Sequence, residues 1–267
     1  MRVWEVLGLD AIQNLPGGTY THKADQVAKA KVAQDAYEAA ISGQSKVSIV
    51  SGGKSALQKA PAASRKLEDG RGFDVRLARD DQNLYLRFDV QSPNPLVNAI
   101  ADPKIVFRGG NLLDMQLATD PKADPARKTP APGDMRLLVS RRDEKPFAVL
   151  FEPKLKGFQG KPIVLKSPTG QESFDRIRVV DNVDLEYKKT QKGFVATVTV
   201  PHSLTGLKLK SGDKLKLDLG YIFGNQGGTR TATRATLFNT SFTANVVDDI
   251  PHESRLEPAN WGEGEVK

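Results

Sequence analysis

The segment 107–121 contains a carboxylate and a carboxamide at a spacing that could bind a polar ligand. Asp114 and Gln116 alternate with leucine and methionine residues, and this two-residue period is typical of a strand buried on one face. Carboxylate and amide groups hydrogen-bond to the hydroxyl groups of sugars, so the polar face of this strand is a candidate for sugar recognition. The alternative is that both side chains are simply solvated, as polar residues usually are.

Two glycines and a proline mark the ends of this strand. Gly109 and Gly110 release the backbone from its usual steric limits, which predicts a tight turn or a close approach of another segment. Pro121 cannot donate a hydrogen bond to a neighbouring strand, so the strand is expected to stop at Asp120. We expect the other hairpins of the domain to pair outward from this strand.

Composition restricts the class of protein. At 267 residues with 39% hydrophobic residues, the chain can form one large β domain, or one domain with an appendage. The sequence has no cysteine, which excludes disulfides, thiolate metal sites and cysteine nucleophiles. The formal net charge is +7, but the basic residues are scattered among acidic ones, so we expect no nucleic-acid partner. No apolar run approaches the ~20 residues that span a bilayer and no signal peptide is visible, so membrane insertion is not expected.

The first third of the chain differs in pattern from the rest. Residues 22–42 repeat apolar positions with a helical period, whereas residues 46–50 suggest a short strand. Residues 55–72 combine small and charged residues with a proline and are typical of an irregular linker. We therefore expect residues 1–69 to form an N-terminal appendage or junction, and residues 70–267 to form a β-sandwich domain with a C-terminal tail.

Strand signals become regular from residue 72 onward. Residues 73–90 contain two alternating segments around a polar turn, the pattern of a β-hairpin. Eight further short segments follow, each bounded by glycine, proline, aspartate or asparagine. This spacing predicts an all-β fold, mainly an antiparallel β-sandwich. The loop over 120–134 contains four prolines, and long loops on β scaffolds often carry function.

The order of these elements resembles that of family 9 carbohydrate-binding modules and of the wider DOMON-like β-sandwiches. The resemblance covers about residues 70–262 and implies a β-sandwich of the divergent kind found within large exported bacterial proteins. It therefore implies an extracellular or periplasmic location. The segments that carry it are LYLRFDV (84–90), GGNLLDMQLATDP (109–121), GDMRLLVS (133–140), FDRIRVV (174–180), the region 193–225 and TRTATRATLFN (229–239).

The resemblance implies a non-catalytic domain that binds a glycan end in a shallow cleft near the strand at 107–121. Sugar rings stack on aromatic side chains while polar groups bind their hydroxyls. Sugar-binding members usually clamp the sugar between tryptophans, whereas this sequence has only Trp4 and Trp261. Core packing of the phenylalanines is the alternative. The candidate binding residues are the rings of Phe107, Phe238 and Trp261 and the polar groups of Asp114, Gln116 and Arg136.

Two kinds of cofactor are suggested by the same resemblance. Related modules carry structural calcium, for which Asp120, Asp124 and Asp134 offer hard oxygen ligands, although loop aspartates also cap turns. Some DOMON-like domains bind haem b through methionine and histidine. Core packing is the alternative for Met115, which shares the apolar face of its strand with leucines. The residues that could ligate haem are Met115, Met135, His22, His202 and His252.

No catalytic motif is present in the sequence. It contains neither a G-x-S-x-G elbow nor an H-E-x-x-H zinc motif, and the glycines of residues 224–230 follow a β-rich segment as in a hairpin loop. We therefore expect no enzyme activity. The alternative to glycan binding is an interaction or spacer domain that contacts neighbouring domains of a larger exported protein through the loop 120–134 and the tail from Val246.

Overall fold

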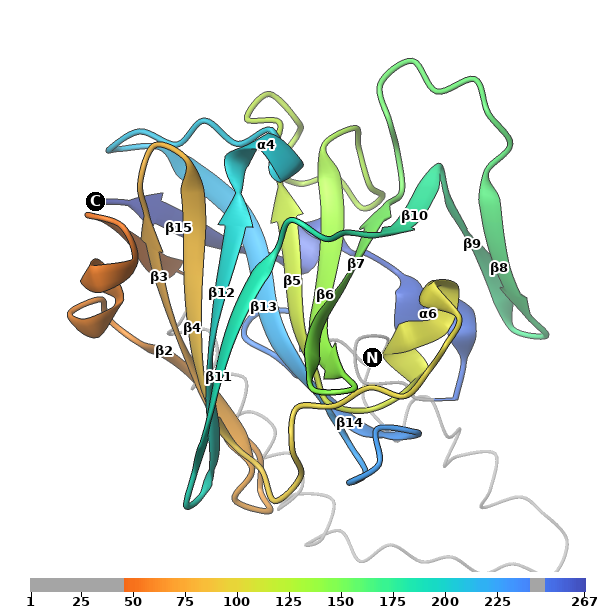
Figure 1. Ribbon diagram of the computed structural model, residues 1–267. Helices are drawn as coiled ribbons and strands as arrows, with labels where there is room; N and C mark the ends of the chain where they lie inside the picture. Colours follow the sequence, from red (N-terminus) through yellow and green to blue (C-terminus); the bar gives the residue numbers. More distant parts are fainter. Residues whose placement is uncertain (1–45, 241–247) are drawn as a thin grey trace, which may run out of the picture. The chain divides into compact units, whose positions relative to one another are not determined.

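The computed structural model describes residues 46–240 and 248–267 (Figure 1). The helix predicted over 22–42 lies outside these residues. The described elements, in chain order, are β1 (Lys46–Ser51), η1 (Lys54–Gln58), β2 (Ala63–Lys66), β3 (Gly72–Arg79), β4 (Asn83–Gln91), η2 (Pro103–Arg108), β5 (Leu112–Ala118), β6 (Asp134–Arg142), β7 (Lys145–Glu152), β8 (Ile163–Ser167), β9 (Gly170–Phe174), β10 (Arg176–Val179), β11 (Asp184–Thr190), β12 (Gly193–Pro201), α4 (His202–Thr205), β13 (Lys214–Gly224), β14 (Thr231–Thr236), α6 (Ile250–Ser254), η3 (Pro258–Asn260) and β15 (Gly262–Val266).

One curled sheet of 13 strands contains all the described strands except the β8–β9 hairpin. Its order is β10-β7-β6-β5-β13-β15-β1-β3-β4-β12-β11, with β14 pairing β13 and β2 pairing β3. Every pairing is antiparallel except those of β1, which runs parallel to both β15 and β3. The prediction of an all-β, mainly antiparallel fold is confirmed.

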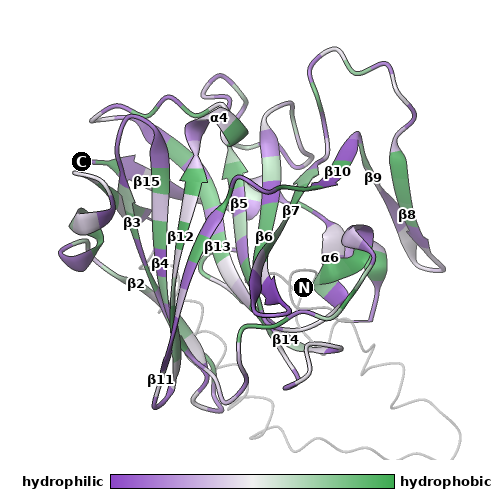
Figure 2. Cartoon of the chain, viewed as in Figure 1, coloured by the Kyte–Doolittle hydropathy of each residue, from purple (hydrophilic) through white to green (hydrophobic). Residues whose placement is uncertain are grey.

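The sheet folds over so that two layers enclose the main core. β5, β6, β7 and β13 form one layer, and β3, β4, β12 and β11 form the other; β15 and β1 join them (Figure 1). Hydrophobic and hydrophilic residues alternate along strands such as β4 and β12, because each strand turns every second side chain toward the core (Figure 2). The predicted β3–β4 hairpin is present, with Leu77 opposite Leu86 inside the core.

The described compact unit begins at Lys46, whereas the sequence suggested a boundary at residue 70. The segment 55–72, predicted to be an irregular linker, contains β2, which pairs with β3 from Ala63 to Lys66. A segment of four residues is too short to show the alternation that distinguishes a strand from a loop. These residues form a strand because they pair with β3. β1 likewise belongs to the sheet through its parallel neighbours.

A second apolar cluster covers the outer face of β5, β6 and β7. η2, α6 and the β8–β9 hairpin pack on this face around Phe107, Phe151, Phe174 and Trp261. The outward side chains of β5 are therefore enclosed instead of facing water, and its whole length is buried. None of the helices in the described ranges 46–240 and 248–267 has the length and hydropathy of a membrane-spanning segment.

Candidate functional site

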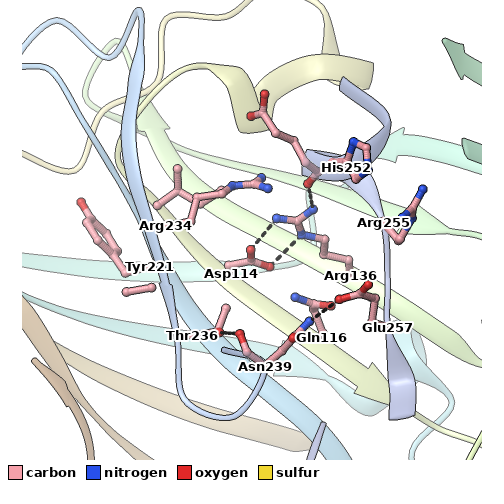
Figure 3. Close-up of a pocket in the computed structure, with 13 residues that line it drawn as sticks. Asp114, Gln116, Arg136, Tyr221, Arg234, Thr236, Asn239, His252, Arg255 and Glu257 are labelled. Carbon is pink, nitrogen blue, oxygen red and sulfur yellow. Dashed lines mark hydrogen bonds and ion pairs between the residues drawn. The ribbon is translucent and has the colours of Figure 1, made fainter. Parts of the chain in front are cut away.

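The outer face of β5 and β6 holds a buried arginine–carboxylate pair. Arg136 donates from Nε to Asp114 Oδ1 over 2.9 Å and from Nη2 to Asp114 Oδ2 over 2.5 Å (Figure 3). Its remaining terminal nitrogen, Nη1, donates to the backbone oxygen of Glu253 in α6 over 2.6 Å. The antiparallel register places Gln116 directly opposite Arg136, with Asp114 diagonal to it, so all three side chains share one face.

Two more charged side chains approach this pair from elements distant in sequence. Arg234 extends from β14, and its Nε and Nη2 atoms are buried without a hydrogen-bond partner in the part of the chain that the structure describes. Both carboxylate oxygens of Glu253 are likewise buried without a hydrogen bond there, although Arg108 Nε lies 3.8 Å from Oε1. Burial, together with the charge of Arg136, lowers the pKa of Arg234 to about 10, against the effect of Glu253 and Asp114. Burial raises the pKa of Glu253, against the effect of Arg234 and Arg108.

These side chains line a cavity of about 20 Å³, which is room for one water molecule. Asn239 donates from Nδ2 to Glu257 Oε2 over 2.9 Å along its border, and His252 and Arg255 complete the rim (Figure 3). A water held here could bond to the groups that lack protein partners. A sugar ring would need more space than this closed arrangement provides.

Asp218 is a further buried carboxylate on the same face of the sheet. It lies opposite Gln116 on β13 and accepts hydrogen bonds from the backbone N–H groups of Leu219, Phe238 and Asn239. Burial, with the charge of Asp114, raises its pKa to about 7, against the effect of these three hydrogen bonds. Asp218 therefore fixes the turn after β14.

The three candidate rings do not form an aromatic clamp. Phe107 and Trp261 are 0% and 5% exposed and belong to the second apolar cluster, where Phe107 contacts Phe151 at 6.0 Å between ring centroids. The guanidinium groups of Arg136 and Arg234 lie 5.9 and 5.8 Å from the Phe107 ring centroid. Core packing, the alternative at the sequence level, therefore describes Phe107. Phe238 is half-buried and packs beside the main core.

The loop aspartates are engaged within the protein. Asp134 is buried, pairs with Arg127 and also accepts a hydrogen bond from the Ala131 backbone. Asp120 and Asp124 each accept a backbone N–H two residues further on, which is the turn-capping role. In the two described ranges, no group of three or more histidines and acidic residues could hold a metal ion.

The residues considered for haem are dispersed. Met115 and Met135 are buried in the main core among leucines, as the core-packing alternative expected. His252 pairs with Asp249, and burial of His202 Nε2 leaves that atom without a hydrogen bond in the described chain. His22 lies outside the described residues.

Three of the residues singled out from the sequence, Asp114, Gln116 and Arg136, lie together around this cavity, and the structure adds Arg234 and Glu253, which the sequence did not indicate. The available signal for Arg234 was a charged residue inside an alternating strand segment, TRTATRAT. No comparable signal exists for Glu253, because α6 is only five residues long and its contacts come from chain segments far away.

Comparisons with solved structures identify the fold. The chain is similar to a family 9 carbohydrate-binding module from Caldicellulosiruptor kristjanssonii in complex with cellotriose, with a TM-score of 0.52, 11% identity and coverage of 83% of this chain and 93% of that one. The same kind of module from that organism in complex with glucose gives a TM-score of 0.53 and 11% identity, covering 83% and 95%. No protein-family profile and no curated protein sequence matches the chain. The fold is that of a family 9 carbohydrate-binding module.

Proposed function

We propose that this protein is a non-catalytic, exported carbohydrate-binding module that recognises a glycan end on the outer face of β5 and β6. The observation that carries the proposal is the set of buried polar atoms without hydrogen-bond partners in the described chain around one small cavity. Gln116 Oε1 and the carboxylate of Glu253 offer acceptors, and Arg234 offers donors. Sugar hydroxyls can both donate and accept, so a single hydroxyl-rich group would satisfy such a mixed set.

Access to this face requires a change in α6. The backbone of Glu253 accepts a hydrogen bond from Arg136, and the helix encloses a cavity with room for only one water. A sugar ring would occupy the enlarged cavity and replace the contact between Arg136 and the Glu253 backbone, while the Arg136–Asp114 pair stays in position below it. The glycan would therefore bind weakly, because part of its interaction energy is used to displace α6.

Calorimetry and protein-observed NMR with glucose and cellotriose test the proposal. The informative variant is Gln116→Leu, which removes an acceptor that has no hydrogen-bond partner among residues 46–240 and 248–267 while conserving side-chain volume. We expect binding in the unmodified protein and about tenfold weaker binding in this variant, the effect of one lost hydrogen bond. Lys154→Ala, on an exposed loop, is the matched control and should bind normally. Absence of binding at millimolar sugar would reject the proposal.

An interaction or spacer domain is the second candidate function. It is favoured by the burial of Phe107 and Trp261, which are therefore not available to clamp a sugar ring beside the cavity. The loop 120–134 would then supply the contact surface. This candidate predicts that Gln116→Leu changes no interaction, and that crosslinking of the protein in its cellular context captures neighbouring domains through the loop.

A further inference from the structure

An open groove lies at the end of the sheet where β3 begins, β4 ends and β11 turns into β12. Gly72, Gln91 and Gly193 lie in register across these strands, so the groove is built on paired backbone at the lower end of the sheet in Figure 1. Its volume is about 920 Å³. Space of this size accepts several sugar units, in contrast to the cavity over β5.

The groove is positively charged, because its lining has four basic side chains against two acidic ones. Asp69 is bound by Arg71, with 2.6 Å between Arg71 Nη2 and Asp69 Oδ2. The other acidic residue of the lining, Asp74, accepts a hydrogen bond from Ser64 over 2.5 Å. Three lysines remain exposed and form no ion pair with the described residues. They are Lys66, Lys189 and Lys192.

The floor between these lysines is held in place. Ser92 donates its backbone N–H to Lys192 O over 3.1 Å, which joins the loop after β4 to the β11–β12 turn. Tyr187 lines the groove, and its ring is fixed by Phe194, 5.3 Å away between centroids, and by the guanidinium of Arg141, 4.4 Å from the Tyr187 centroid. The Tyr187 hydroxyl has no hydrogen-bond partner in the described ranges. β11, which carries Tyr187 and Lys189, is predominantly hydrophilic (Figure 2).

We infer that this groove binds a carboxylate-bearing oligosaccharide, such as a chain of uronic acid units. The unpaired ammonium groups match carboxylates repeated along a chain, and the Tyr187 hydroxyl together with the amide of Gln191 matches sugar hydroxyls. This site is separate from the outer face of β5, so the result of its test does not depend on whether the proposed glycan-end site exists.

Affinity electrophoresis with polygalacturonate tests this inference. We expect polygalacturonate to retard the protein, and the same polymer with its carboxyl groups reduced to leave it unaffected. Lys66→Ala, Lys189→Ala and Lys192→Ala combined should weaken binding about tenfold, the combined weight of three exposed charge contacts. Added salt should weaken binding as well, because exposed charges are screened.

The matched control is Lys154→Ala, Lys156→Ala and Lys161→Ala combined, which removes the same charge from exposed positions between β7 and β8. This control should bind polygalacturonate as the unmodified protein does. Equal loss in both triple variants, equal binding of the reduced polymer, or preferential binding of single-stranded DNA of equal charge would overturn the inference. Thermal unfolding of both variants, expected to be unchanged, verifies that they fold.

Discussion

Arg136 binds Asp114 through two parallel hydrogen bonds, and both side chains are enclosed between the sheet and α6. A carboxylate and a guanidinium removed from water stabilise the fold only as a pair, because either one alone would be an uncompensated buried charge. The pair therefore connects the stability of this face to any binding that takes place on it.

Asp114→Ala is expected to lower the free energy of unfolding by about 3–5 kcal/mol, since it leaves Arg136 buried without its carboxylate. Urea unfolding measures this change. Asp184→Ala, at an exposed position of β11, is the control and should change stability by less than about 0.5 kcal/mol. A loss below 1 kcal/mol for Asp114→Ala, roughly the value of a surface pair, would show that the pair is hydrated.

Arg234 and Glu253 should be energetically coupled. Each single change, Arg234→Met or Glu253→Gln, leaves the other buried charge with less compensation. The double variant should therefore lose less free energy of unfolding than the two single variants together. We expect a coupling of about 1–3 kcal/mol in a double-mutant cycle measured by urea unfolding. Strict additivity would mean that the two charges do not interact.

Asp218 should make stability depend on pH. Its pKa is raised to about 7 in the folded protein, so the folded state holds more protons than the unfolded state above the ordinary aspartate value of 3.8. This contribution is fully present below pH 3.8 and is lost as pH rises through about 7. Asp218→Asn should remove this part of the dependence, by an amount on the order of a few kcal/mol.

The measurement for Asp218 is the free energy of unfolding at several pH values between 4 and 8, compared between the unmodified protein and Asp218→Asn. The difference between the two curves isolates this carboxyl from the other acidic residues. Parallel curves would contradict the raised pKa.

Gly110→Ala should destabilise the fold by about 3 kcal/mol or more through overpacking. A Cβ on Gly110 would lie 2.1 Å from the Cα of Gly224, so the two backbones touch where β5 begins and β13 ends. Gly170→Ala is the control, because a Cβ there meets nothing within 4 Å. Equal thermal stability of both variants would contradict this close approach.

Local pattern predicted much of the fold because alternation and turn residues act over short distances. The close approach expected at Gly109 and Gly110 is present, and the apolar face of β5 points into the main core. The eight alternating segments after β5 correspond to strands, and the glycines of residues 224–230 form the loop between β13 and β14.

The candidate site was less predictable because its covering elements are distant in sequence. From the sequence, the polar face of β5 is expected to be exposed to solvent. In the structure it is covered by α6, which follows β5 by more than a hundred residues. A short helix carries too few turns for a periodic signal. The burial of Trp261 likewise depends on its place in the second apolar cluster, whose members are distant in sequence, and no local pattern records this.

The position of β15 has a consequence for how the chain acquires this structure. β15 pairs with β13 on one side and with β1 on the other, so residues 262–266 join the two layers of the sheet. On a ribosome, this junction cannot form until nearly the whole described chain has been synthesised. β1 can pair with β3 early, but its pairing with β15 must wait for residues more than two hundred positions later, and contacts so far apart in sequence are slow to form. Folding is therefore completed after translation of β15, and until then the parallel edge of β1 is available to other strands.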